Sequence, residues 1–150
     1  MMGGWHGGST TQYSLLAPQA EGGFAAAVAL SPACRARLGD WNGVGGVYHP
    51  VAPLLVLIGV LDDWTPAEPC RQMVETARAA RHPAAIKIYG GAHHSFDSAN
   101  PVRYMGTRIN PNASGGRGAT TGGNAEAWAD SICGVLAFFD QRLAPAVGSR

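Results

Sequence analysis

One apolar run limits the folds open to this chain more than any other feature of its sequence. Residues 53–60 read Pro-Leu-Leu-Val-Leu-Ile-Gly-Val, without alternation between apolar and polar side chains. A strand of this kind must be covered on both faces, which is typical of a parallel sheet. Two further apolar runs, Phe24–Leu30 and Ala85–Tyr89, supply additional candidate strands. We therefore expect an α/β fold with three or four mostly parallel strands and at least two flanking helices.

A helix is expected between the second and third apolar runs. Thr65 can cap it, Pro66 suits its first position, and Glu68 completes a capping box. The helix should end near Arg81, because Pro83 follows. Its apolar face would consist of Cys70, Met73, Val74 and Ala77. Strand, helix and strand at this spacing form a right-handed crossover.

The last part of the chain combines an irregular stretch with a clear helix. Residues 39–51 and 97–124 are rich in Gly and lack periodicity, so we expect loops there, the second one lid-like. Asn124 can cap a final helix. An apolar stripe at helical spacing predicts a core face for this helix, made of Trp128, Ile132, Val135, Leu136, Phe139 and Leu143.

Composition excludes several classes of protein. The chain has 150 residues, 46% of them hydrophobic and 14% charged, which indicates one folded domain over residues 1–150. The formal net charge is +1 without a block of like charges, so nothing indicates a nucleic-acid partner. No apolar run reaches the ~20 residues of a membrane-spanning helix. The start lacks the regions of a signal peptide, so we expect a cytoplasmic chain, with export left open for a longer parent protein.

The three cysteines match neither a disulfide framework nor a zinc pattern. We expect buried apolar thiols at Cys34, Cys70 and Cys133. The alternative is a bridge between two of them if the parent protein is exported, in which case the odd count leaves one thiol free.

Two pairs of ionisable side chains follow two neighbouring strands. Asp62 and Asp63 come just past the central apolar run, and His93 and His94 come just past the next one. Parallel strands lie ~4.8 Å apart, and ligands bind at their carboxyl ends, so one Asp and one His can meet there. An Asp that accepts from one imidazole nitrogen leaves the other nitrogen as a base. Alternatively, the Asp is a turn or cap residue and the His is structural.

The motifs around these residues resemble the dienelactone hydrolase family. They are Asp62-Asp63-Trp64-Thr65-Pro66, then Gly-Ala-His-His-Ser-Phe-Asp at 91–97, then the Gly-rich segment 110–123. The resemblance runs from about Gly4 to Leu143. It implies a doubly wound α/β-hydrolase fold, of which this chain would be a C-terminal part. It also implies ester or lactone cleavage by a nucleophile, a His and an Asp, without a metal or other cofactor. The family's acid corresponds to Asp62 and its base to His94.

The nucleophile is where the sequence departs from the family pattern. A Gly-x-Ser/Cys-x-Gly-Gly elbow is expected, and the corresponding segment reads Gly-Trp-His-Gly-Gly-Ser-Thr from Gly4. Either His6 stands at the nucleophile position, or that position is deleted between Trp5 and His6, which is the alignment we favour. Ser9 lies inside the helix start, where packing or capping is its expected role. The start of the chain, Met1-Met2-Gly3, supplies no buried strand before this elbow.

The sequence therefore predicts a hydrolase-family chain whose activity is impaired because its nucleophile is missing. Its substrate would be a small ester or lactone. The alternative is a non-catalytic remnant that binds a ligand or a partner chain, including a second copy through an exposed sheet edge. A metal site at His93, His94 and Asp97 is disfavoured, because adjacent side chains point apart in extended backbone. Further candidates are the second-choice catalytic residues Asp63, His93, His6 and Ser9, and the substrate-contacting residues Trp5, Trp64 and Arg117.

Overall fold

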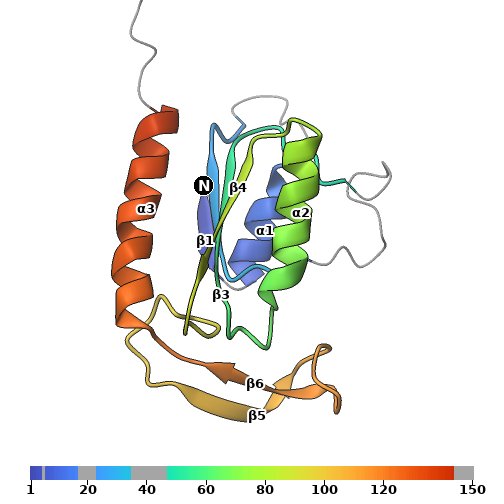
Figure 1. Ribbon diagram of the computed structural model, residues 1–150, viewed down its shortest axis with the longest axis vertical. Coiled ribbons are helices and arrows are strands. Elements are labelled where there is room, and N and C mark those ends of the chain that lie inside the picture. Colours follow the sequence, from blue (N-terminus) through green and yellow to red (C-terminus); the bar gives the residue numbers. More distant parts are fainter. Residues whose placement is uncertain (5, 17–22, 35–46, 144–150) are drawn as a thin grey trace, which may run out of the picture.

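The computed structural model describes residues 1–4, 6–16, 23–34 and 47–143. Within them a four-stranded parallel sheet has the strand order β1-β2-β3-β4 (Figure 1). Its strands are β1 (Met2–Gly4), β2 (Ala27–Leu30), β3 (Leu54–Gly59) and β4 (Ala84–Tyr89). The two central strands are almost wholly buried, as the unbroken apolar run predicted. The predicted α/β fold with a parallel sheet is thereby confirmed.

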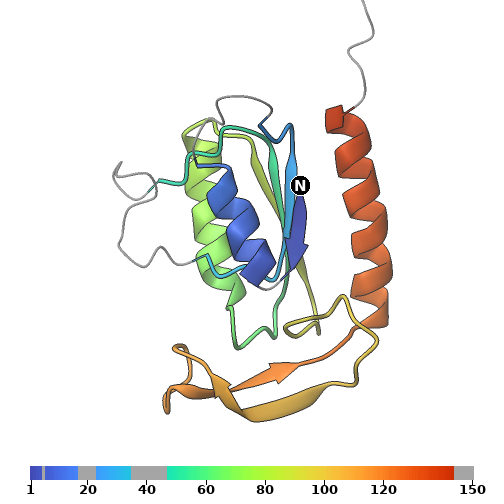
Figure 2. The same ribbon diagram turned by 180° about the vertical axis from the view of Figure 1, so that it is seen from behind.

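Helices cover both faces of this sheet. Helices α1 (His6–Ser14) and α2 (Ala67–Ala79) lie on one face, and α3 (Ala125–Leu143) lies on the other (Figures 1 and 2). The first side of the core joins the predicted face of α2 to residues of β2 and β3. The second side places Ala127 of α3 against Leu57, Tyr89 and Phe96. The sheet is therefore sandwiched between two helical layers.

The first strand corrects one expectation. Met2–Gly4 pairs in parallel with β2, although the sequence offered no buried strand there. The strand lies at the edge of the sheet, and Met2 is 59% exposed. Backbone pairing with β2, rather than an apolar pattern, holds it in place.

The helix ends follow the predictions in part. Asn124 caps α3, because its side-chain oxygen accepts from the backbone N–H of Ala127 at 3.0 Å. Thr65 does not cap α2: the cap position is Pro66, which makes no side-chain cap hydrogen bond. The hydroxyl of Thr65 is used elsewhere, in the site described below.

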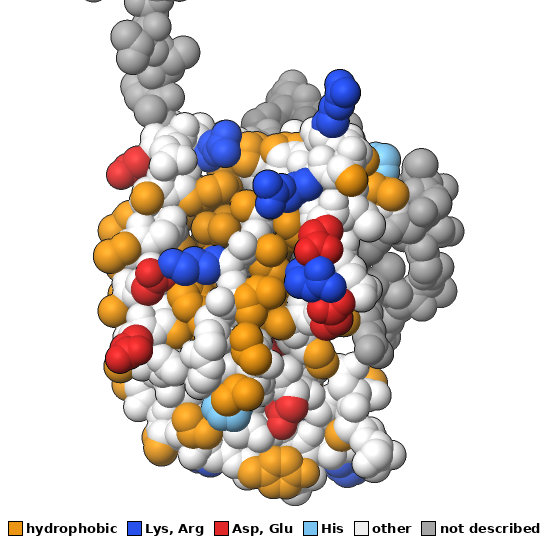
Figure 3. Space-filling model, in the orientation of Figure 1, with side chains coloured by type: hydrophobic (Ala, Val, Ile, Leu, Met, Phe, Trp, Pro, Cys, Tyr) orange, Lys and Arg blue, Asp and Glu red, His pale blue; other side chains and the backbone are white. Residues whose placement is uncertain are grey.

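The apolar stripe expected to be the core face of α3 is largely exposed. Trp128, Ile132 and Leu136 are 36%, 49% and 60% exposed, whereas Val135 and Phe139 of the predicted stripe are partly buried and pack against the core. The buried residues of the helix are Ala127 and Ser131, each one position earlier. One position corresponds to ~100° around a helix, so the face against the sheet is rotated from the predicted stripe. Figure 3 shows apolar side chains open to solvent on the side of the molecule where α3 lies.

The segment expected to be an irregular loop contains two strands. Strands β5 (Arg103–Ile109) and β6 (Arg117–Thr121) form an antiparallel pair that lies across the lower end of the main sheet (Figure 1). Most side chains of β5 are exposed, so this strand has no buried face that a sequence pattern could reveal. We call residues 103–121 the hairpin.

The cysteines also depart from the expected buried thiols. Cys34 and Cys70 form a disulfide between the segment after β2 and helix α2, and Cys133 is exposed. The two bridged residues are buried as predicted, but they are not thiols. None of the helices in the described ranges is long and apolar enough to cross a membrane.

Candidate active site

A close contact between two loops brings the predicted acid, Asp62, and the predicted base, His94, together. Gly59 ends β3, and a Cβ built on it would lie 2.0 Å from the carbonyl oxygen of Ala92, so only glycine fits here. The backbone N–H of Leu61 donates to that same carbonyl at 2.9 Å. The loop after β3 is thereby fixed against the loop after β4. Asp62 and His94 follow these anchor points directly.

Asp62 and His94 form a buried pair, as the strand-end motifs predicted. Asp62 Oδ2 lies 2.9 Å from His94 Nδ1, and their side chains are 0% and 2% exposed. The choice of these two residues over their neighbours is confirmed as geometry, while their catalytic role stays a prediction. A buried carboxylate needs full hydrogen bonding to be stable.

The remaining hydrogen bonds of the carboxylate come from the turn that follows it. Asp62 Oδ1 accepts from the backbone N–H of Trp64 at 3.1 Å and of Thr65 at 2.7 Å. Asp62 Oδ2 also accepts from the Thr65 hydroxyl at 2.9 Å. Four donors therefore surround this carboxylate, counting the imidazole, and they fix its orientation.

The imidazole is oriented by the same group of residues. The carboxylate of Asp62 accepts the proton on His94 Nδ1, so the lone pair lies on Nε2, as a general base requires. The Thr65 hydroxyl lies 3.0 Å from His94 Nδ1, and the Trp64 ring lies 4.8 Å from the imidazole, centroid to centroid. Ser95, next in the chain, has a φ of 63°, an uncommon conformation that often occurs at functional sites.

Thr65 is a site residue that sequence reasoning missed. The capping-box pattern assigned it to the start of α2, yet its hydroxyl contacts both Asp62 and His94. An Asp side chain often accepts hydrogen bonds from residues two or three positions later and so closes a turn. The Asp62–Thr65 spacing was therefore the sequence signal that could have placed Thr65 in the site.

The second-choice residues have other contacts. Asp63 turns away from the imidazole, and its carboxylate accepts from the backbone N–H and the hydroxyl of Thr120 in the hairpin, at 2.8 and 2.9 Å. His93 Nδ1 lies 3.0 Å from the carbonyl oxygen of Leu61. Both residues thus connect loops around the site.

The elbow segment runs from the end of β1 into α1. Helix α1 packs closely on the sheet at Gly8, where a Cβ would lie 2.5 Å from the carbonyl oxygen of Leu30. The Ser9 hydroxyl accepts from the backbone N–H of Ala33 at 3.0 Å, which is a packing role. Trp5 and the side chain of His6 lie outside the described residues. No Ser or Cys stands between β1 and α1 in the sequence.

Two predicted substrate contacts lie at or near the hairpin. Trp64 lies between the imidazole and the hairpin, because its ring contacts His94 and its Nε1 donates to the carbonyl oxygen of Ile109 at 3.0 Å. Arg117 is exposed and donates to the carbonyl oxygen of Thr107 at 3.3 Å. Contact of either residue with substrate stays a prediction. No three His, Cys, Asp or Glu side chains within the described ranges converge as a metal site would require.

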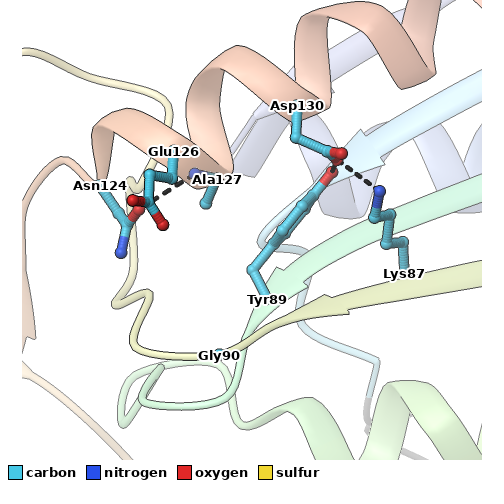
Figure 4. A pocket seen from close by; sticks show the side chains of 7 residues that line it. All are labelled: Lys87, Tyr89, Gly90, Asn124, Glu126, Ala127 and Asp130. Atoms are coloured by element: carbon cyan, nitrogen blue, oxygen red, sulfur yellow. Dashed lines mark hydrogen bonds and ion pairs between the residues drawn. The ribbon is translucent and has the colours of Figure 1, made fainter.

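A separate open cavity of about 270 Å³ lies beside β4 and α3 and contains neither member of the pair. Lys87 and Tyr89 both point to Asp130 there (Figure 4). A hydrogen bond from Lys87 lowers the pKa of the Asp130 carboxyl, and burial, together with the bond to Asp130, raises the pKa of Tyr89. These groups satisfy one another, so the cavity shows no chemistry of its own.

Several solved structures share the fold of this chain. A dienelactone hydrolase from Klebsiella pneumoniae, so described, is 22% identical with a TM-score of 0.63, over 93% of this chain and 50% of that one. Esterase 2 of Thermogutta terrifontis phosphorylated by paraoxon is 20% identical with a TM-score of 0.62, over 97% and 55%. The butyrate-bound esterase from that species is 14% identical with a TM-score of 0.63, over 99% and 58%.

At these identities the solved structures show the shared fold, and the chain spans about half of their length. No curated protein matches the chain. The model of the dienelactone hydrolase family matches residues 47–143, which include both Asp62 and His94. The chain therefore belongs to the dienelactone hydrolase family.

Proposed function

We propose that this chain carries the acid and the base of an ester or lactone hydrolase, with Asp62 orienting His94. The observation that carries the proposal is the buried pair, 2.9 Å apart, in a member of this family. His94 Nε2 takes the proton of the attacking group as that group adds to the carbonyl carbon. His94 then gives the proton to the leaving alkoxide. The substrate is a small ester or lactone, and no step requires a metal or an organic cofactor.

The covalent step needs a hydroxyl or thiol at the elbow, where the sequence reads Gly4-Trp5-His6-Gly7. We therefore infer little or no esterase activity for the chain as written. His94 can still activate a water, and triads without their nucleophile retain about 10³- to 10⁴-fold catalysis over water through binding and the oxyanion hole.

We also propose that the hairpin acts as a lid. Its support is the hydrogen bonding of the hairpin to Asp63 and Trp64, directly after the acid. In that position it would form a wall of the substrate site and exclude water from it.

Hydrolysis of a short-chain aryl ester tests the catalytic proposal, with His94→Ala as the inactive comparison. A trace activity that His94→Ala abolishes supports it, and a rate above the uncatalysed background that is equal in the two chains refutes it. A fluorophosphonate probe tests the missing nucleophile. Stoichiometric labelling of the unmodified chain at Ser9 would show that the chain has a nucleophile after all. Insertion of Ser between Trp5 and His6 should not restore burst hydrolysis by itself.

The alternative function is a non-catalytic module that binds a ligand or a partner chain. The absent elbow hydroxyl favours it, as does the edge position of β1 and β4 in the described sheet, which leaves backbone groups open to pairing. Sedimentation of the purified chain distinguishes the two functions. A stable dimer that is lost when Pro replaces an edge residue supports the module.

The Cys34–Cys70 disulfide bears on the cellular compartment in which the protein works. A cytoplasmic chain is the expectation from the sequence alone, whereas a buried disulfide is typical of exported proteins. We infer that the parent protein works in an oxidising compartment. Alkylation of thiols in intact cells, followed by mass spectrometry, would refute this if both Cys34 and Cys70 are modified.

A further inference from the structure

We propose that the hairpin positions His94 through Trp64, which makes Trp64 a positioning residue. The inference rests on the proposed function, in which His94 is the base. The Asp62 carboxylate accepts the proton of His94 Nδ1, and the Thr65 hydroxyl contacts the same ring atom. Rotation about the last side-chain bond of a His is broad, so a contact with the face of the ring helps to fix its plane.

The indole of Trp64 supplies that contact. Its ring lies 4.8 Å from the imidazole, centroid to centroid, with the planes tilted by 51°. His94 is 2% exposed, so the ring that covers it also limits the access of water. A flat ring against the imidazole fixes the direction in which Nε2 points, which the Asp62 carboxylate alone does not.

The hairpin holds the indole on more than one side. Trp64 Nε1 donates to the carbonyl oxygen of Ile109 at 3.0 Å, and the Arg108 guanidinium lies 5.3 Å from the Trp64 ring centroid, a cation–π contact. Asn112 Nδ2 donates to the backbone carbonyl of Trp64 at 2.8 Å. The indole therefore moves with the hairpin.

A second set of hydrogen bonds joins the hairpin to the loop after β3, which carries Asp62 and Asp63. The Asp63 carboxylate accepts from the N–H and the hydroxyl of Thr120 on β6. Asn110, which is buried, donates to the backbone carbonyl of Asp63 at 3.0 Å and to that of Gly118 at 2.7 Å. We call the Asp63–Thr120 contact the latch. Opening the latch would free the hairpin, and with it the indole.

Nitrogen-15 NMR of the imidazole in the full chain tests this inference without any need for turnover. The readout is the rate at which the proton on His94 Nδ1 exchanges with water. We expect Trp64→Ala to raise that rate by up to about tenfold, the size of an aromatic pair contribution. Trp64→Phe retains a ring but not the bond to Ile109, so it should restore part of the protection. The latch variants Asp63→Ala and Thr120→Val should raise the rate by a smaller factor.

Trp128→Ala is the matched control, because this residue is a half-exposed Trp on α3 that lies outside the site. Its exchange rate should equal that of the parent chain. Equal rates in Trp64→Ala and the parent would overturn the inference, as would equal acceleration by Trp128→Ala. If Trp64→Ala does not fold, the exchange rates of Trp64→Phe and of the two latch variants test the inference instead. An unchanged rate of His94 Nδ1 exchange in all three overturns the inference. Unaltered hydrolysis in His94→Ala would refute the proposed function without changing this result.

Discussion

Replacement of Asp62 provides the sharpest test of the site, because its carboxylate accepts four hydrogen bonds while fully buried. Asp62→Ala removes all four acceptor contacts. The Thr65 hydroxyl can turn to the carbonyl oxygen of Ser31, 3.2 Å away, but the imidazole and two backbone N–H groups lose their acceptor. A buried donor that is left without its acceptor costs about 1–3 kcal/mol, so the loss of three acceptors should lower the unfolding free energy by about 3–5 kcal/mol. Since a small domain has a urea slope of about 2 kcal/mol per molar, we expect the midpoint to fall by about 2 M.

Asp62→Asn separates geometry from charge. The amide oxygen can keep the two bonds from the backbone, so the expected loss is about 1–2 kcal/mol. Its NH₂ group then faces His94 Nδ1 and donates to it, which moves the ring proton to Nε2 and removes the base. Nitrogen-15 NMR would show this change of tautomer directly. Asp140→Asn, an exposed position on α3, should stay within about 0.5 kcal/mol of the parent chain. An Asp62→Ala midpoint as high as that of Asp140→Asn would refute the described pairing.

Three further predictions concern the surrounding fold. Gly8→Ala places a methyl group 2.5 Å from a backbone oxygen of β2, so we expect about 1–3 kcal/mol of destabilisation, measured as a lower urea midpoint. Reduction of the Cys34–Cys70 bridge, which has a sequence separation of 36, should cost about 4 kcal/mol on the chain-entropy model; calorimetry with and without a reductant would contradict it if Tm is unchanged. The Asp130 carboxyl has a lowered pKa because of Lys87, so its contribution is present above about pH 4 and is lost as the pH falls. Asp130→Asn should therefore lower the urea midpoint at pH 7 and have no effect near pH 2; an equal effect at both values would contradict the ion pair.

The centre of the fold and the acid–base pair were predictable because they depend on local sequence patterns. The uninterrupted apolar run of residues 54–59 required a strand covered on both sides. Polar residues immediately after two adjacent parallel strands must meet at one edge of the sheet. Asp62 and His94 follow from that rule, and the structure confirms that they are in contact.

Other features were not predictable, because they depend on contacts between distant segments. Most side chains of β5 are exposed, so hydrogen bonds to Asp63 and Trp64 hold the hairpin without an apolar pattern. Strand β1 is three residues long and is defined by its pairing with β2. The face of α3 that meets the sheet is rotated from the predicted stripe, because its buried residues are Ala127 and Ser131, which an apolar pattern does not single out. Thr65 fits both a helix capping box and a turn closed by the side chain of Asp62. The sequence alone does not decide between these two roles.

The contact between Gly59 and Ala92 has a consequence for the order in which the chain folds. Asp62 and His94 are separated by only 32 positions and belong to neighbouring strands joined by one helix. Contacts that close short loops form earlier than those between distant segments. We expect residues 54–96 to be the nucleus of folding, in which Asp62 and His94 meet before the hairpin or α3 has docked. A ribosome-bound chain stalled soon after this segment emerges would then already hold the two side chains together. The contact between Asp62 and His94 would then form within this crossover, and the direction of the imidazole would be fixed only later, when the hairpin docks on Trp64.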